Sequence, residues 1–355
     1  PQTTSVTMRT MMKTAFLTGI RELEIRQRPI PSVESPDDVL LRVRRVGVCG
    51  SDVHYYASGR IGSQVVQFPY PVGHEMAGEV VEVGDGVADL QPGTRVAVDP
   101  AVSCGRCDQC LSGRKHTCRT LKFLGCPGQM EGCLSEYIVM PAQCCFPISD
   151  AMSYDQAAIS EPLSIGLYAT RLAGGLAGKS IAILGSGPIG LSVLLPAVEQ
   201  RAEKTFVTDR LDYRCGIALE HGATWAGNPD TVDVLGDIQA AEPNALDVVF
   251  ECCGEQTALD QGMHLLKPGG TLMIVGIPEA DRMCYSPDIA RRHELTLQNV
   301  RRQNECVQPA LDLISSGAVD PDSMITHEFP LDECKQAFDL VDQYADGVVK
   351  AMIHM

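Results

Sequence analysis

The chain has 355 residues, which is enough for two domains. Its formal net charge of −16 excludes a surface built to bind nucleic acid, which needs clustered lysine and arginine. No apolar run reaches the length of about 18 residues that a transmembrane helix needs, and residues 1–13 form a polar tail without the apolar core of a secretory signal. Fifteen cysteines without any sign of export indicate a reducing compartment, so we expect a cytoplasmic protein.

The predicted secondary structure changes along the chain, which indicates domains with different architectures. Between residues 23 and 139, short β-type runs are broken by glycine and proline, and helical periodicity is scarce. From residue 179, strand-like and helical segments alternate, as in a parallel sheet covered by helices. We therefore predict an α/β protein. The later strand candidates are 180–184, 205–208, 247–252 and 271–275, followed by amphipathic helices at 307–314 and 334–341 and strand-like segments at 324–329 and 348–353.

A glycine-rich turn follows the first of these strands and precedes an apolar helix candidate. Gly185, Gly187 and Gly190 form the pattern G-x-G-x-x-G, in which Pro188 and Ile189 open the helix. The first glycine permits the tight turn, the second lets the backbone approach a pyrophosphate, and the third lets helix and strand pack closely. The free N–H groups at the start of the helix attract phosphate. The turn therefore predicts a dinucleotide site.

The residue that ends the next strand candidate indicates which dinucleotide binds. Asp209 can accept hydrogen bonds from both ribose hydroxyls of NAD, and its charge repels the 2′-phosphate of NADP. Arg210 follows directly, and an arginine in this place can accommodate a 2′-phosphate. We predict NAD rather than NADP as the cofactor.

Four cysteines lie on one short segment with the spacing C-x2-C-x2-C-x7-C. Thiolates so close together can surround zinc tetrahedrally and leave no open position, so such a site supports the structure and performs no chemistry. An iron–sulfur cluster of the ferredoxin type would place the fourth cysteine sooner and before a proline, which this chain does not do. The predicted ligands of this structural zinc are Cys104, Cys107, Cys110 and Cys118.

A second set of candidate metal ligands is distributed over three segments. Cys49 lies in Gly-Val-Cys-Gly-Ser-Asp-Val-His, His74 and Glu75 are adjacent, and Glu161 stands in Ser-Glu-Pro. A thiolate, an imidazole and a carboxylate suit zinc with one position left for water or substrate. Each residue alone is more often simply packed in a core, but together they predict a catalytic zinc site.

These motifs together resemble the zinc-containing medium-chain dehydrogenase/reductase superfamily over residues 15–353. Segments 49–56, 58–62 and 161–166 are similar to its polyol branch, which includes sorbitol, xylitol and L-arabinitol dehydrogenases. The resemblance implies a β-rich GroES-like catalytic domain with both zinc sites and a Rossmann domain, a doubly wound parallel sheet, for NAD. The implied division is a tail at 1–13, a catalytic domain at 14–160 and 298–355, and a coenzyme domain at 161–297.

The resemblance also implies roles for individual residues. Cys49, His74 and Glu75 match ligands of the catalytic zinc, and Glu161 matches either a fourth ligand or a carboxylate bonded to zinc-bound water. The positions matched beyond the ligands are Ser51 and His54 in a proton relay, Tyr55, Glu161 and Arg301 around the polyol, Asp209 and Arg214 around the adenosine, and Val275, Gly276 and Ile277 beside the nicotinamide.

The chain departs from its branch at one substrate position. Where many polyol enzymes have Phe-Arg-Tyr, this chain has Val300-Arg301-Arg302. A second cation facing the cleft would alter which polyol fits, or favour a substrate that carries negative charge.

The predicted reaction is the zinc-dependent oxidation of a secondary alcohol of a small polyol, such as sorbitol, xylitol or arabinitol, to a ketose. Zinc makes a bound hydroxyl acidic, and the nicotinamide takes the hydride. The proton leaves to water, to Ser51, or through a relay that ends at His54.

Two other functions are weighed against this one. An enzyme like L-threonine 3-dehydrogenase shares the layout, and Arg302 would meet the carboxylate of its substrate. A non-catalytic NAD(P)-binding relative would lack the set of Cys49, His74 and Glu75. On resemblance alone we expect a homo-oligomer, a tetramer or a dimer.

Overall fold

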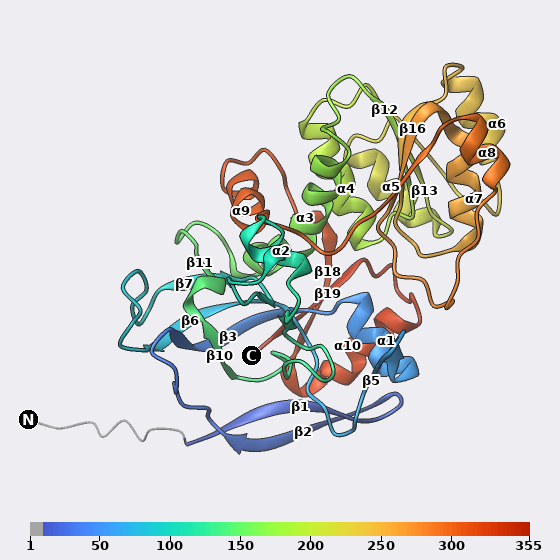
Figure 1. Ribbon diagram of the computed structural model, residues 1–355. Coiled ribbons are helices and arrows are strands. Elements are labelled where there is room, and N and C mark those ends of the chain that lie inside the picture. Colours follow the sequence, from blue (N-terminus) through green and yellow to red (C-terminus); the bar gives the residue numbers. More distant parts are fainter. Residues whose placement is uncertain (1–9) are drawn as a thin grey trace, which may run out of the picture.

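A computed structural model describes residues 10–355 of the chain, whose elements group around two large sheets (Figure 1). Met11 already belongs to strand β1 (Met11–Gly19), which pairs with β2 (Glu22–Pro29) in an antiparallel hairpin. The predicted tail therefore ends before Met11, and the rest of that prediction lies outside the described residues. None of the helices within residues 10–355 has the length and apolar character that a membrane span requires.

The first sheet contains seven strands within the described residues, and its centre is formed by segments far apart in the chain. The C-terminal strand β19, which overlaps the strand-like segment predicted at 348–353, pairs antiparallel with β3. The strand order is β11 (Cys145–Pro147), β7 (Arg95–Val98), β6 (Glu75–Val83), β3 (Asp38–Gly47), β19 (Lys350–His354) and β18 (Ile325–Pro330), with β10 (Tyr137–Pro141) also on β3.

Short elements surround this first sheet. Helix α1 (Gly50–Ser58) starts directly after β3 and lies against α10 (Cys334–Asp342). The remaining elements here are the strand pairs β4 (Arg60–Ile61) with β5 (Gln64–Val65) and β8 (Ala101–Val102) with β9 (Lys122–Phe123), and the helices α2 (Asp108–Leu111) and α9 (Val307–Ser315).

The second sheet is parallel throughout and has six strands in the described chain. Numbered from its first strand, its order is 3-2-1-4-5-6, the arrangement of two mononucleotide-binding halves. The α/β fold with a doubly wound sheet is thereby confirmed. Its elements are β12 (Ser180–Leu184), α4 (Pro188–Glu199), β13 (Lys204–Thr208), α5 (Asp212–Glu220), β14 (Trp225–Gly227), α6 (Val234–Ala241), β15 (Leu246–Glu251), α7 (Gln256–Leu265), β16 (Leu266–Ile274), α8 (Pro287–Arg292) and β17 (Thr296–Asn299).

Helix α3 (Tyr154–Leu172) joins the two halves of the molecule (Figure 1). It begins with a capping box, in which Ser153 and Gln156 satisfy each other's backbone N–H groups. Its buried face packs on β6, β3 and β7 of the first sheet and on α4 beside the second. The predicted domain boundary at 160/161 falls inside this continuous helix, and the one at 297/298 falls inside β17, so the exact boundaries stay predictions.

The contact between α3 and α4 leaves no room for a side chain at Gly166. A Cβ atom there would lie 1.9 Å from the carbonyl oxygen of Ser192 on α4. We predict that Gly166→Ala lowers the free energy of unfolding by about 1–3 kcal/mol, because the helices must separate. Gly216→Ala is the matched control, since a Cβ on α5 meets nothing within 4 Å. Equal urea denaturation midpoints for Gly166→Ala and the unaltered protein would contradict this packing.

Candidate active site

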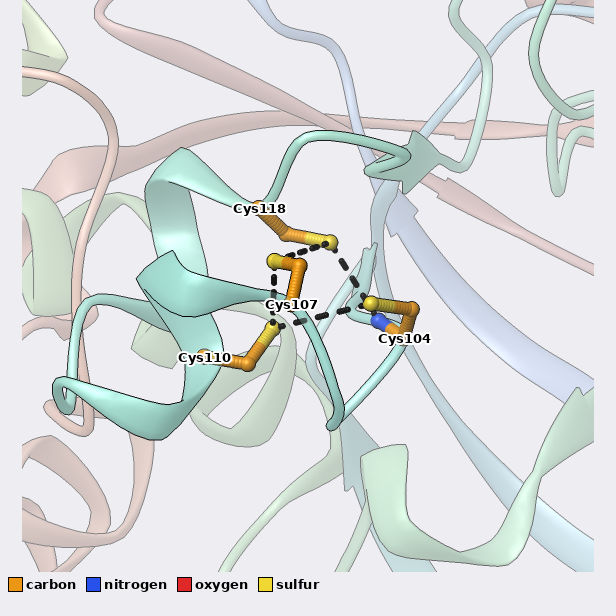
Figure 2. Close-up of side chains that lie close together, drawn as sticks. All are labelled: Cys104, Cys107, Cys110 and Cys118. Atoms are coloured by element: carbon orange, nitrogen blue, oxygen red, sulfur yellow. Dashed lines mark hydrogen bonds between the residues drawn. The ribbon is translucent and has the colours of Figure 1, made fainter.

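The four closely spaced cysteines converge on one point in a lobe formed by α2 and the turns around it. Figure 2 shows their sulfur atoms turned toward one another, and the four Sγ atoms all lie within 4.8 Å of each other. Cys107 Sγ lies 3.6 Å from Cys110 Sγ and 3.9 Å from Cys118 Sγ. Backbone N–H groups of Arg106 and Cys107 lower the pKa of the Cys104 thiol to about 6, which favours the thiolate. All four are free thiols, so the lobe fits a closed tetrahedral zinc site.

The second predicted ligand set also comes together, at the end of β3. Cys49 precedes α1, and Glu75 is the first residue of β6. The ligand atoms of Cys49, His74 and Glu75 all lie within 4.8 Å of one another. His74 and Glu75 are only 5% and 1% exposed. One sulfur, one imidazole and one carboxylate in a nearly dry place are the donor set of an open zinc site.

Strand register explains why these residues meet. Gly47, the last residue of β3, pairs with Glu75 on one side and with Met352 on the other. The chain then turns into α1, which places Cys49 beside both neighbouring strands. A Cβ atom at position 47 would lie 2.2 Å from the Glu75 carboxylate, so this position requires glycine.

Two further charged residues, Asp52 and Lys350, contact the candidate ligands. Asp52 lies 3.3 Å from His74 Nδ1 and accepts the Gly73 N–H at 3.2 Å. Burial opposes protonation of His74, but the charges of Asp52 and Cys49 outweigh it and raise the pKa of the imidazole. Carboxylates in this position commonly orient a metal-bound histidine. The anionic surroundings therefore suit a cation.

Lys350 on β19 binds the other side of the site. Its Nζ donates to both oxygens of Glu75, at 2.8 and 2.7 Å, and to the Val48 carbonyl at 3.2 Å. Both side chains of this ion pair are 1% exposed. Lys350 thus fixes the Glu75 carboxylate and offsets part of the negative charge of the ligand set.

Glu161 extends from α3 toward the same site but is not one of the three grouped ligands. It is 4% exposed, and its Oε2 has no hydrogen-bond partner among the described residues. Burial raises the pKa of Glu161 to about 7, against the opposing charge of His74. A buried carboxyl oxygen without a partner fits a place for water or a substrate hydroxyl. Direct ligation by Glu161 stays a prediction.

The two residues of the predicted relay face different sides of α1. Ser51 Oγ donates to Cys49 Sγ at 3.3 Å, so it lies on the ligand side. His54 Nδ1 lies 3.6 Å from Glu279 of the other half of the molecule. His54 and Ile277 line one cavity of about 180 Å³ between the two halves. A direct contact between Ser51 and His54 is not formed in the described structure.

The predicted substrate residues differ in exposure. Tyr55 is 4% exposed and donates its hydroxyl to Gln64 Oε1 at 3.1 Å. The Arg302 guanidinium lies over the Phe123 ring, with Cζ 3.4 Å from its centroid. Phe123 in turn lies 5.2 Å from the His74 ring, centroid to centroid. Arg301 is exposed at the surface.

The glycine-rich turn has the geometry that a dinucleotide needs. Gly185 has φ of 98°, a left-handed conformation that favours glycine. A Cβ at Gly190 would lie 1.9 Å from the Gly185 carbonyl oxygen, so strand and helix approach as closely as the motif predicts. Gly187 precedes Pro188, the first residue of α4, whose N-terminus faces the turn.

Asp209 stands beside this turn and accepts the Ser186 N–H at 2.8 Å and the Leu211 N–H at 3.0 Å. Arg210 is turned toward Asp230, at 2.8 Å, and is therefore occupied by that carboxylate. Arg214 is buried and donates to the Val348 carbonyl at 3.0 Å, so it links the coenzyme half to the catalytic half. Its predicted place beside the adenosine stays a prediction.

The segment predicted beside the nicotinamide follows β16. The N–H groups of Val275 and Gly276 both donate to the Glu251 carbonyl, at 2.8 and 2.9 Å. The next residue, Ile277, is 51% exposed and lines the cavity that His54 also faces. The segment therefore borders the space between the two halves.

Sequence reasoning missed several supporting residues. Asp52 stands inside the Cys-Gly-Ser-Asp-Val-His motif, and its place one turn after Cys49 was the available signal. Lys350 had no local signal, because its partner Glu75 lies 275 positions away. Phe123 carried no pattern that distinguishes it from a core residue.

Both halves of the chain match domain families of known proteins. Residues 35–150 match the alcohol dehydrogenase GroES-like domain, and residues 188–316 match the zinc-binding dehydrogenase domain. Sorbitol dehydrogenase of Bacillus subtilis is 35% identical over 344 residues, which cover 97% of each chain. The chain belongs to the zinc-binding dehydrogenases. The predicted resemblance is thereby confirmed, together with the GroES-like and nucleotide-binding parts of the fold.

Other members of this family widen the comparison. L-idonate 5-dehydrogenase of Vitis vinifera is 33% identical, and the matched region covers 96% of this chain and 94% of the relative. The solved structure of a zinc-binding dehydrogenase from Sinorhizobium meliloti, bound to NADP, is 33% identical and superposes with a TM-score of 0.88. The matched region covers 98% of this chain and 100% of that one. This zinc-binding dehydrogenase therefore shares its fold with the solved structure, and it is similar over nearly its whole length to two enzymes whose named substrates differ.

The two ligand sets predict separable losses of zinc. We expect the purified enzyme to contain two zinc ions per chain, one for each ligand set. Cys49→Ser and Cys107→Ser should each remove one, because zinc sites lose affinity when a thiolate is replaced. Cys284→Ser, at an exposed position outside both sets, should retain both. Elemental analysis gives the counts, and two zinc ions in Cys49→Ser would show that Cys49 is not a ligand.

Proposed function

We propose that this zinc-binding dehydrogenase oxidises a secondary hydroxyl of a small polyol to a ketone, with NAD as the hydride acceptor. The observation that carries the proposal is the convergence of Cys49, His74 and Glu75, with the buried and unpartnered Glu161 oxygen on the helix beside them. A polyol can place one hydroxyl at the metal site while its neighbours bind polar side chains, and such pairing discriminates well against simple alcohols. The similarity to a sorbitol dehydrogenase supports the same substrate class.

The chemistry divides between the bound groups and the chain. Cys49, His74 and Glu75 would hold a zinc ion that makes the substrate hydroxyl acidic, and the glycine-rich turn and Asp209 would hold the NAD that accepts the hydride. Glu161 Oε2 is buried and has no hydrogen-bond partner in the described structure, so it is available to accept the hydroxyl proton. Ser51 orients the Cys49 sulfur, and His54 on the cavity side can pass a proton to solvent.

The preference for NAD over NADP rests on Asp209. Its two oxygens are held by the backbone N–H groups of Ser186 and Leu211, so the carboxylate stays at the end of β13. Arg210, the cation that could favour a 2′-phosphate, is paired with Asp230. A carboxylate in this place repels the 2′-phosphate and accepts ribose hydroxyls.

We also propose a cytoplasmic location and a homo-oligomer, a tetramer or a dimer. The support for the location is chemical: all fifteen cysteines are free thiols, several of them predicted zinc ligands that a reducing compartment keeps available. The oligomer rests on resemblance to the family alone.

The alternatives from the sequence have less support. A non-catalytic binding protein does not explain a complete and buried ligand set with Asp52 and Lys350 behind it. A threonine dehydrogenase needs an anionic group for the substrate ammonium as well as a cation for its carboxylate, whereas we assign Glu161, the unpartnered carboxyl at this site, to the hydroxyl.

The test is NAD reduction across sorbitol, xylitol, arabinitols, ribitol, galactitol, inositols, threonine and ethanol, each with NAD and with NADP. We expect pentitols or hexitols to be oxidised with higher kcat/KM than ethanol or threonine, and NAD to exceed NADP. A zinc chelator should abolish the activity, and added zinc should restore it. Faster turnover of ethanol would overturn the polyol assignment, and a preference for NADP would reject the role of Asp209.

A further inference from the structure

Arg302 is a half-buried cation one aromatic ring away from the candidate zinc site. Its guanidinium lies over Phe123, with Cζ 3.4 Å from the ring centroid, and the Phe123 ring centroid lies 5.2 Å from that of His74. The charge of Arg302 acts on Tyr55 and Glu161, two of the predicted substrate residues. Arg302 therefore lies close to the place where the substrate is expected.

The buried end of this side chain lacks the partner that a buried charged donor normally has. Nη1 is buried without a hydrogen-bond partner, and within the described part of the chain no carboxylate forms an ion pair with Arg302. Buried charged donors are usually paired, since an unpaired one loses its hydration without compensation. The nearby Glu161 carboxyl leaves its own Oε2 unpartnered rather than bonding the guanidinium.

The backbone also holds Arg302 in an unfavourable conformation. Its φ is 52°, in the left-handed region that a side chain with a Cβ seldom adopts. Residues with such strained backbone conformations cluster at ligand-binding sites, where the surrounding structure maintains the strained conformation. Burial and the charge of Arg301 lower the pKa of Arg302 to about 10, which still leaves the guanidinium charged at neutral pH.

We propose that Arg302 binds a carboxylate of the substrate, so that the enzyme prefers aldonic acids, polyols with one terminal carboxylate, to neutral polyols. The inference rests on the proposed polyol oxidation and specifies its substrate class. A planar guanidinium pairs with a carboxylate through two parallel N–H···O bonds, which would satisfy the free Nη1. The carboxylate takes no part in the redox step: a secondary C–H bond gives its hydride to NAD, the hydroxyl proton leaves, and the carbon becomes a ketone.

The test compares pentonates and hexonates with the pentitols and hexitols of the same configuration. The enzymes are the unaltered zinc-loaded protein, Arg302→Tyr, Arg302→Lys and the control Lys122→Met, which removes an exposed cation next to Phe123. In the unaltered enzyme we expect the best acid to exceed its neutral counterpart in kcat/KM. Arg302→Tyr should lower kcat/KM for the acid about 10- to 100-fold, the value of a charge-assisted hydrogen bond, and change that for the polyol little. Arg302→Lys should lower kcat/KM for the acid less than Arg302→Tyr does. Lys122→Met should retain the preference for the acid over the neutral polyol.

A binding measurement separates recognition from turnover. The dissociation constant of the acid from the enzyme–NADH complex, followed by NADH fluorescence, should rise in Arg302→Tyr by a factor similar to the loss in kcat/KM. Zinc content and the thermal midpoint show whether each variant is folded. Oxidation of neutral polyols with equal or lower activity on the acids would overturn this inference and leave the proposed function standing. Oxidation of neither class would overturn both.

Discussion

The catalytic zinc site depends on a balance of charges in a place that water barely reaches. Glu75 and Lys350 form an ion pair in which each side chain is 1% exposed, and Asp52 and Cys49 add negative charge around His74. Loss of one partner from a buried pair typically costs about 3–5 kcal/mol, because the other charge is left uncompensated. A divalent cation held by Cys49, His74 and Glu75 would complete this balance, and its binding would then be coupled to the stability of the catalytic half.

The fold meets this constraint by bringing together the end of β3, the start of β6 and the C-terminal strand β19. Helix α3 contributes Glu161 to this site. The same helix packs on both the first sheet and α4, so the metal site borders the coenzyme half. The apolar contact of α3 with α4, close enough to require Gly166, fixes the distance between the two halves. The cavity between them is bordered by His54 on one side and Ile277 on the other.

Local patterns predicted the parts of the molecule that local chemistry determines. The four cysteines and the glycine-rich turn each lie on one short segment, so their spacing contains most of their geometry, and strand alternation was enough for the parallel sheet. The supporting residues Lys350 and Phe123 were out of reach, because their roles arise from contacts between distant segments. The exact domain boundaries stay predictions, because helix α3 packs on both halves of the molecule. In the sequence Arg302 was recognisable only as a departure from the polyol branch, and its buried, unpartnered Nη1 became visible only in the structure.

The most direct test of this account is a crystal structure of the enzyme with zinc and NAD, with anomalous diffraction measured at the zinc edge. The account predicts a zinc ion in the four-cysteine lobe and a second one about 2.3 Å from Cys49 Sγ and about 2.0–2.2 Å from a His74 nitrogen and a Glu75 oxygen. Zinc in the lobe alone, with Cys49 and His74 bound to no metal in an enzyme that still oxidises polyols, would contradict it.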